Sequence, residues 1–416
     1  MSYCRVHGEG LRIYIDSMNW MFSRGHSRSD EWIDKNTGAW DYNAAAKDNK
    51  YSLIDMNPLK VASFDSSATP TAHIMHEFDS RMVLSNPIRS FAIMGHNALS
   101  AQVAFRLTYR TSTFTNPGDG TTIGSVAVPP VAVLNGTINP STGASLAEIL
   151  DATETAIDVD DGTKFTIGEY IRIYYAASGI EVVKVTGIAT NTLTVTRAQQ
   201  GTSGLSFPSN ATLTRYNVVE PATDGDTIIT FTEVNDARHW AIETIPSDGV
   251  MTSTDLGIGS YQIGNYHDFA IAPDLSVKHA FIQSGVKTRE TPAGRQLTFA
   301  HYLSNNDSTE DYGYSPFRNI FYIRRMIGKE QWSLTWKGTD DTNVYPEDLG
   351  TPGSGQLLGD FIHHVAINFL PFILCTDKDS TLQADYMWSI LDQNSFETMQ
   401  KSWRWVGYSL KFIQKF

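Results

Sequence analysis

Histidine and carboxylate side chains that lie close together in the sequence are the first candidates for chemistry. The segment HIMHEFD brings together His73, His76 and Glu77, and all three are residue types that bind metal ions. Their spacing matches neither of the helical zinc motifs, HExxH and HxxEH. On a strand, residues three apart point to opposite faces, so His73 and His76 would not bind one ion together. We therefore predict no metal site here.

Two further histidine positions have a simple structural interpretation. His363 and His364 are adjacent in a predicted helix, where neighbouring side chains diverge by about 100°. His96 belongs to the GHN step at 95–97, which precedes an alternating apolar pattern at 103–107. A histidine in such a turn can act as a base or a ligand, but we favour a polar loop residue bonded to nearby backbone.

Acidic and glycine-rich segments fail the tests for known binding loops. DVDDG at 158–162 suggests a calcium loop, yet in the EF-hand frame Ile157 and Val159 take the first and third positions and Gly168 the twelfth. A turn between strands is the simpler interpretation. The sequence has no GxxxxGK[ST] or GxSxG motif, and GIGSYQIG has the wrong spacing for dinucleotide binding. We predict no catalytic residue, no cofactor and no enzymatic activity.

Aromatic side chains are the remaining candidates for a site. Trp32, Trp40 and Tyr42 are spaced among Asp, Asn and Gly, and exposed aromatic rings stack on sugars or anchor protein partners. We predict these three residues as a glycan or subunit contact. Four tryptophans lie instead on alternating strand patterns and are interpreted as core or edge packing: Trp332, Trp336, Trp403 and Trp405.

The composition is typical of a folded acidic protein. The chain has 416 residues, of which 41% are hydrophobic, enough for two or three domains. A net charge of −13 with 19% charged residues does not favour direct nucleic-acid binding or an anionic membrane surface. Cys4 and Cys375 show no disulfide or metal spacing, and we expect Cys375 to be buried.

Membrane insertion is not expected either. The most apolar stretch, 361–375, contains two histidines and Pro371 and is shorter than a bilayer span. The first residues lack the apolar region of a secretory signal.

The pattern along the chain predicts strands almost throughout. Gly, Thr, Ser, Asn and Asp recur every ten residues or so, and β-branched and aromatic residues fill the intervals. We predict a mainly β fold: a jelly-roll-like β-sandwich with an inserted small β domain and a C-terminal α+β segment. The predicted segments are an irregular arm at 1–57, a discontinuous sandwich at 58–134 and 218–345, the inserted module at 135–217, and the C-terminal segment at 346–416.

Three stretches resemble proteins of a known class. The inserted module shows a DG turn followed by the patterns F..G.YI.I, E.V.VT.I and TLTV.R and a closing GT. This series resembles a small β module of tailed-bacteriophage virion proteins. FAIMGHNALSAQVAFRLTY is similar to the opening of galactose-binding-like sandwiches in phage tail proteins, and DFAIAPDLSVKHAFIQ and FIHHVAINFLPFILCTDKDS resemble segments of tail-tip proteins.

The resemblance implies a structural virion protein of a phage tail tip or baseplate, similar to distal tail proteins. Such proteins assemble into homo-oligomeric rings, commonly six-fold or three-fold, that join the tail tube to host-recognition components. The implied partners are other copies, other tail proteins and a host surface glycan. The implied location is the virion, after synthesis in the host cytoplasm.

Two alternatives remain open at this stage. A carbohydrate-binding or receptor-binding tail protein would use the sandwich or the module to contact host glycans. A polysaccharide hydrolase would need a pair of carboxylates at a defined separation, which sequence does not reveal.

Overall fold

The computed structural model describes the backbone of most of the chain. Conformation is described for 10–28, 32–34, 50–64, 74–79, 88–114, 121–122, 131–135, 137–138, 141–199, 202–216, 218–234, 237–246, 255–269, 271–274, 277–283, 286–290, 296–300, 328–340, 344, 358, 362, 370–392 and 397–415. These residues form two compact units: unit 1 takes Met1–Ile15 with Tyr266–Phe416, and unit 2 takes Asp16–Asn265.

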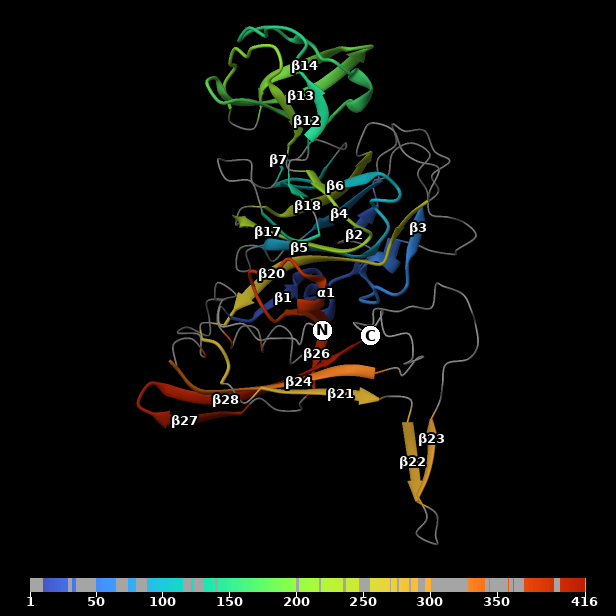
Figure 1. The fold of residues 1–416 in the computed structure, drawn as a ribbon, viewed down its shortest axis with the longest axis vertical. Coiled ribbons are helices and arrows are strands. Elements are labelled where there is room, and N and C mark those ends of the chain that lie inside the picture. The colour runs from blue at the N-terminus through green and yellow to red at the C-terminus, as the bar shows by residue number, and fades with distance from the viewer. Residues whose placement is uncertain are drawn as a thin grey trace. The chain divides into compact units, whose positions relative to one another are not determined.

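Unit 2 contains two antiparallel sheets that form neighbouring layers in Figure 1. The larger sheet has the order β2(Trp32–Asp34), β4(Ile74–Asp79), β18(His239–Pro246), β6(Val103–Arg110), β16(Val218–Glu220) and β9(Thr137–Ile138), with β7(Thr121–Thr122) beside β6. The other comprises the first half of β20(Ser260–Asp268), then β5(Ile88–His96), β17(Gly225–Val234) and β8(Val131–Leu134). A separate pair joins β3(Ala62–Phe64) to β19(Leu256–Ile258).

Large aromatic side chains fill the space between these two layers. The Tyr261 ring of β20 lies 6.1 Å from the ring of Trp32 and 6.0 Å from that of Phe91, centroid to centroid. His96 of β5 meets Phe105 of β6 edge-on at 5.9 Å. Burial of such rings is the main source of stability for a sheet packed on a sheet.

The short helix of unit 2, α1(Ser17–Ser23), begins at a capping carboxylate. Asp16 accepts hydrogen bonds from the backbone N–H groups of Met18 and Asn19, which satisfies two donors that the first turn leaves unpaired. The other short helical turns are η1(Lys50–Ile54), η3(Gly162–Lys164) and η6(Gln383–Asp385).

The inserted module folds as one closed sheet, called the barrel below. Its order is β10(Ser141–Ser145), β15(Thr212–Arg215), β12(Tyr170–Tyr175), β13(Gly179–Ala189), β14(Thr192–Gln199) and β11(Ala156–Asp158). A bridge between Leu146 and Val159 joins the two ends of this sheet. Ile171, Ile173 and Leu193 are among the buried side chains that fill its interior.

The chain enters and leaves the barrel through adjacent strands. β9 pairs with β16 in antiparallel register, with Ile138 opposite Val219 and Thr137 opposite Glu220. β16 also pairs with β6, with Val218 opposite Arg106. The module is therefore inserted at a point where the two ends of the host chain already lie together.

Unit 1 contains a long antiparallel sheet. Its order is β21(Lys278–Gln283), β24(Gly328–Asp340), β28(Trp405–Gln414), β26(Tyr386–Leu391), β25(Phe372–Cys375) and β1(Arg12–Asp16), with β27(Thr398–Ser402) paired to β28. A separate hairpin pairs β22(Val286–Glu290) with β23(Gln296–Ala300). The Trp336 ring stacks on Phe269 and Tyr408 at centroid distances of 5.0 and 4.8 Å, inside a core of buried apolar side chains.

The predicted fold class is confirmed at the level of a mainly β chain with several antiparallel sheets, consistent with a sandwich-type class. The compact units divide the chain differently from the predicted segments, because residues 266–345 lie in unit 1 with the C-terminal residues. A period of two shows that a segment is a strand but does not show which sheet it joins. The predicted helix before Pro371 lies mostly outside the described residues.

Candidate interaction surface

His96 is a structural residue at the end of β5. It is the last strand residue, opposite Gly225, so the turn begins one residue later than predicted. Its Nδ1 atom accepts a hydrogen bond from the Ala98 N–H at 3.3 Å, and Nε2 lies 2.9 Å from Thr227 Oγ1. Burial lowers the pKa of His96 from 6.5 to about 4. The ring is therefore neutral at pH 7, with Nε2–H donating to Thr227.

The two residues beside His96 fix the path of the chain. Gly95 has φ +60°, and a Cβ atom there would lie 2.6 Å from the Pro58 carbonyl oxygen. The Asn97 side chain accepts from the Gly257 N–H at 2.7 Å and donates to the Asp255 carbonyl at 2.8 Å. The GHN step therefore connects strands by backbone geometry and hydrogen bonding.

The structure corrects the prediction for Trp32. Its side chain is 0% exposed, and its ring stacks on that of His76 at 5.0 Å with an interplanar angle of 4°. Trp32 is therefore part of the unit 2 core and has no free face for a sugar or a second subunit. The sequence could not show this, because β2 pairs with β4, which lies far along the chain. Trp40 and Tyr42 lie outside the described residues.

The remaining candidate side chains are placed as structural groups or are not described. Glu77 and His76 are both buried on β4, and Glu77 Oε1 lies 2.8 Å from Nδ1 of His239. His73, His363, His364 and Cys4 lie outside the described residues. Cys375 is buried, as predicted, and burial raises the pKa of its thiol to about 12. Within the described ranges, no cluster of His, Cys, Asp or Glu has the arrangement of a metal site.

The acidic segment DVDDG runs from the last residue of β11 through a bend into η3, so it connects two elements. Asp161 caps the η3 turn by accepting from the Thr163 N–H at 3.1 Å, and Asp160 accepts from the Ser145 N–H at 2.9 Å. A Cβ atom on Gly162 would lie 2.0 Å from the Thr190 carbonyl oxygen, so this position requires glycine. The carboxylates of this segment order the barrel end through local hydrogen bonds.

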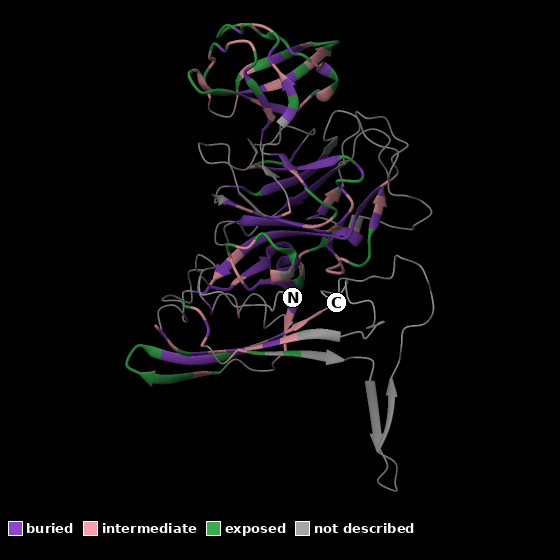
Figure 2. Cartoon of the chain, viewed as in Figure 1, coloured by how far each residue is buried: buried purple, intermediate pink, exposed green. Residues whose placement is uncertain are grey.

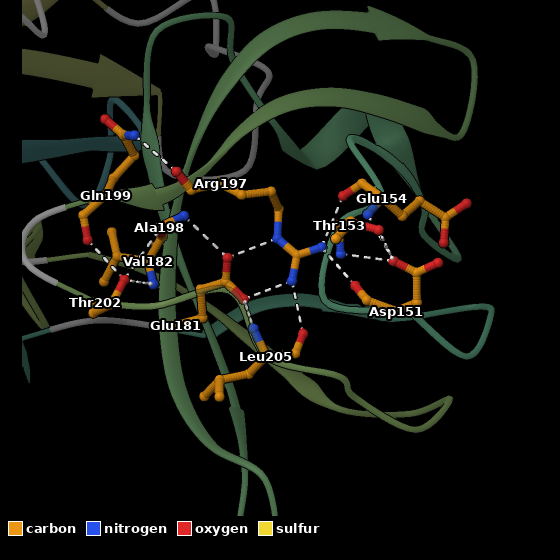
Figure 3. Close-up of polar contacts among 10 residues, drawn as sticks. All are labelled: Asp151, Thr153, Glu154, Glu181, Val182, Arg197, Ala198, Gln199, Thr202 and Leu205. Atoms are coloured by element: carbon orange, nitrogen blue, oxygen red, sulfur yellow. Dashed lines mark hydrogen bonds and ion pairs between the residues drawn. The ribbon is translucent and has the colours of Figure 1, made fainter.

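A buried ion-pair network holds the barrel sheet together (Figure 3). The Arg197 guanidinium donates two hydrogen bonds of 2.6 Å to Glu181 and further bonds to the carbonyl groups of Asp151, Glu154 and Leu205. Glu181 is 0% exposed and also accepts from two backbone N–H groups. Every polar atom of this pair is bonded, which is the condition under which a buried pair is stable.

A second set of buried charges lies where the barrel joins the sandwich. Arg106 forms an ion pair with Glu243, and its guanidinium lies 5.9 Å from the Tyr170 ring of the barrel. Arg215 Nε lies 3.4 Å from Glu169 Oε2. Burial raises the pKa of Glu169, and the charges of Arg215 and Arg106 act in the opposite direction.

Among the described residues, two hairpins each carry several exposed apolar side chains, and others are scattered over loops. Met399 of β27 is 61% exposed, and Trp403 and Trp405, at the turn into β28, are 87% and 46% exposed. Figure 2 shows this end of the β27–β28 hairpin as exposed. On the barrel, Tyr174 and Ile180 face each other across β12 and β13, and the Arg172 guanidinium lies 5.4 Å from the Tyr174 ring.

Of the four tryptophans that we predicted to pack in the core or at a sheet edge, two are buried and two are exposed. Trp332 and Trp336 are each 2% exposed, whereas Trp403 and Trp405 are not buried. The signal for the difference was present in MQKSWRW, because two positive charges interleave with the aromatic residues there. That pattern favours a hairpin whose aromatic side chains stay in solvent over a core strand.

Comparisons with protein-family models, curated proteins and solved structures give no match to this chain. Among the described residues, no helix has the length and apolarity needed to cross a bilayer.

Proposed function

We propose that this chain is a non-enzymatic structural protein of a phage tail tip or baseplate. It assembles into a ring that joins the tail tube to host-recognition components, and it resides in the virion. Other tail proteins are its partners. The proposal treats the exposed hairpins as contact surfaces and the buried charges as parts of the scaffold.

One observation carries this proposal. The residues of the pattern that resembles the phage module are the residues that build the barrel. The pattern residues Phe165, Ile171 and Leu193 fill its core. Gly162 of the DG turn has no room for a side chain, and Arg197 and Glu181 form the buried pair. Because the residues of the pattern are those that determine the fold of the barrel, the match supports a resemblance between the whole barrel and the phage module.

Detection in virions tests the tail role directly. Purified particles labelled with an antibody against residues 141–216 should show label at one end of the tail. Label on the capsid, or absence of the chain from purified virions by mass spectrometry, would contradict the proposal. Light scattering on the purified protein tests ring formation separately, because a closed ring has one mass over a range of concentrations.

A second candidate function is carbohydrate or receptor binding. The exposed rings of Trp403 and Trp405 favour it, since indole faces stack on sugar rings. A glycan array probed with wild-type protein and with Trp403→Ala tests it. Saturable binding that the variant loses would support this function, and equal signals for the two proteins would argue against a role for Trp403.

A further inference from the structure

The tip of the β27–β28 hairpin combines exposure with a tight turn. Ser402 pairs with Trp405, so Trp403 and Arg404 form the two-residue turn. Arg404 has φ +74°, a left-handed conformation of the kind that tight hairpin turns commonly use. The turn presents Trp403, the most exposed large hydrophobic side chain among the described residues.

The outer face of the hairpin is flat beside these rings. β28 alternates, with Val406 and Tyr408 directed into the unit 1 core and Trp405 and Gly407 on the other face. Met399 lies opposite Gly407. The Trp405 ring lies beside Gly338 of β24, where a Cβ atom would be 3.5 Å from the ring, an ordinary contact distance. Met399, Trp403 and Trp405 form the hairpin patch.

Lys401 and Arg404 flank the exposed rings of the hairpin patch in a chain whose net charge is −13. Arg404 lies 3.5 Å from Asp340, and Lys411 further along β28 is paired with Asp392 at 2.6 Å, so the positive charge beside the rings comes mainly from Lys401. The partner of the hairpin patch should therefore offer negative charge around an apolar centre.

The barrel carries a surface of that description. Residues 148–161 contain six acidic and no basic residues, and Ile149 among them is 77% exposed. Local bonds hold these carboxylates together: Glu148 accepts from the Asp158 N–H at 2.6 Å, and Asp151 accepts from the Glu154 N–H at 2.8 Å. The Glu154 side chain points away from the Arg197 network in Figure 3. The stretch 148–161 is called the acidic rim.

We propose that the hairpin patch of one copy docks on the acidic rim of a second copy. Trp403 and Met399 contact Ile149 at the centre, and Lys401 faces the rim carboxylates. The two surfaces differ, so the contact is head-to-tail, and it forms a ring when the rotation from one copy to the next divides a full turn. This inference rests on the proposed ring function and names its interface.

A double serine variant tests the apolar part of the contact. The protein that carries both Trp403→Ser and Trp405→Ser should keep the mass of a single chain in light scattering, at concentrations where the wild type forms rings. Leu382→Ser is the matched control, because Leu382 is 60% exposed in the same unit but lies outside the hairpin. Circular dichroism should show equal strand content in all three proteins, since the exchanged side chains are exposed.

Charge reversal tests the direction of the contact. Lys401→Glu should weaken assembly at least tenfold in midpoint concentration, because a carboxylate then faces the acidic rim at every contact. Glu154→Lys should weaken assembly less, because five of the six rim carboxylates remain. An equal mixture of the two variants should assemble better than Lys401→Glu alone. In a six-fold ring in which the two variants alternate, the reversed charge at 401 meets the reversed charge at 154. Raised salt should weaken wild-type assembly, since exposed charge pairs are screened.

The possible results distinguish failure of the hairpin contact from failure of ring formation and from failure of the tail role. Rings that form equally well in the serine and charge variants would overturn the hairpin contact and leave ring formation standing. A wild-type protein that stays a single chain at all concentrations would overturn both, whereas labelling of virions tests the tail role independently. Where the wild-type mass corresponds to an even number of copies, loss of assembly without rescue in the mixture would overturn the pairing of hairpin with rim.

Discussion

At the scale of single residues, His96 shows how burial fixes a protonation state. The folded pKa of about 4 lies below the ordinary value of 6.5, so the unfolded chain binds a proton more readily between these pH values. His96 therefore lowers the stability of the folded chain as pH falls from 6.5 to 4. Above 6.5 it adds no pH dependence, because the ring is then neutral in both states.

A His96→Gln variant should lose this pH dependence. The difference in unfolding free energy between wild type and variant should increase by about 1–3 kcal/mol from pH 4 to pH 6.5 and then stay constant. Urea unfolding at a series of pH values measures it. Parallel curves for the two proteins would show that His96 does not titrate differently in the two states.

Gly95 should tolerate a methyl group far less than another left-handed glycine. Both Gly95 and Gly25 have positive φ, but a Cβ atom on Gly25 meets nothing within 4 Å, whereas on Gly95 it would lie 2.6 Å from a backbone oxygen. We expect Gly25→Ala to cost about 1 kcal/mol and Gly95→Ala to cost clearly more. Thermal unfolding of both variants measures the difference, and equal losses would contradict the close contact.

At the scale of elements, the barrel contains a buried ion pair, Arg197–Glu181, that the alternation of residues in the sequence does not reveal. Ile171, Ile173, Leu193 and Val195 alternate along β12 and β14 and are interior residues. In β13 alternation from Val182 would place Val182 in the same core, but the structure places Val183 there and Val182 beside Tyr170 and Tyr216. Arg197 and Glu181 could not be paired in advance, because their contact depends on the register of β13 with β14.

Removal of the Arg197 charge should loosen the barrel selectively. Arg197→Met leaves Glu181 buried without its counter-charge, which costs about 3–5 kcal/mol. Arg172→Met is the control, because Arg172 is half-buried and its guanidinium lies over the Tyr174 ring, an interaction worth about 0.5–1 kcal/mol. Hydrogen exchange in peptides from 179–199 should accelerate strongly in the first variant and little in the second. Equal exchange rates would show that the pair contributes little.

At the scale of the whole molecule, the sequence predicted features that depend on neighbouring residues and did not predict which distant strands pair. The strands and the inserted module could be recognised from the sequence because each depends on alternation and turn residues close together. The grouping of residues 266–345 with the C-terminal strands could not, since β24 pairs with β28 across the sequence. The same limit applies to the exposed tryptophans, because period two places Trp403 and Trp336 in similar strands.

Removal of the barrel should leave the rest of unit 2 folded. Replacement of residues 140–217 by a two-residue Asn-Gly turn would join β9 to β16 in their existing antiparallel register. We expect a soluble protein in which β5, β6 and β17 keep slow hydrogen exchange. Some stability should be lost, as Arg106 would no longer be covered by Tyr170. An insoluble product, or fast exchange throughout these strands, would mean that the sandwich needs the barrel to fold.

The same pair of strands also determines how the barrel would respond to mechanical load. Both connections leave the β9–β16 ladder at one end, so tension on the barrel opens hydrogen bonds one after another instead of shearing them together. Peeling of this kind proceeds at low force. Because β9 and β16 are the last two strands of the larger sheet of unit 2, a pull on the barrel would act first on this edge of the sheet and on the β16–β6 pair next to it.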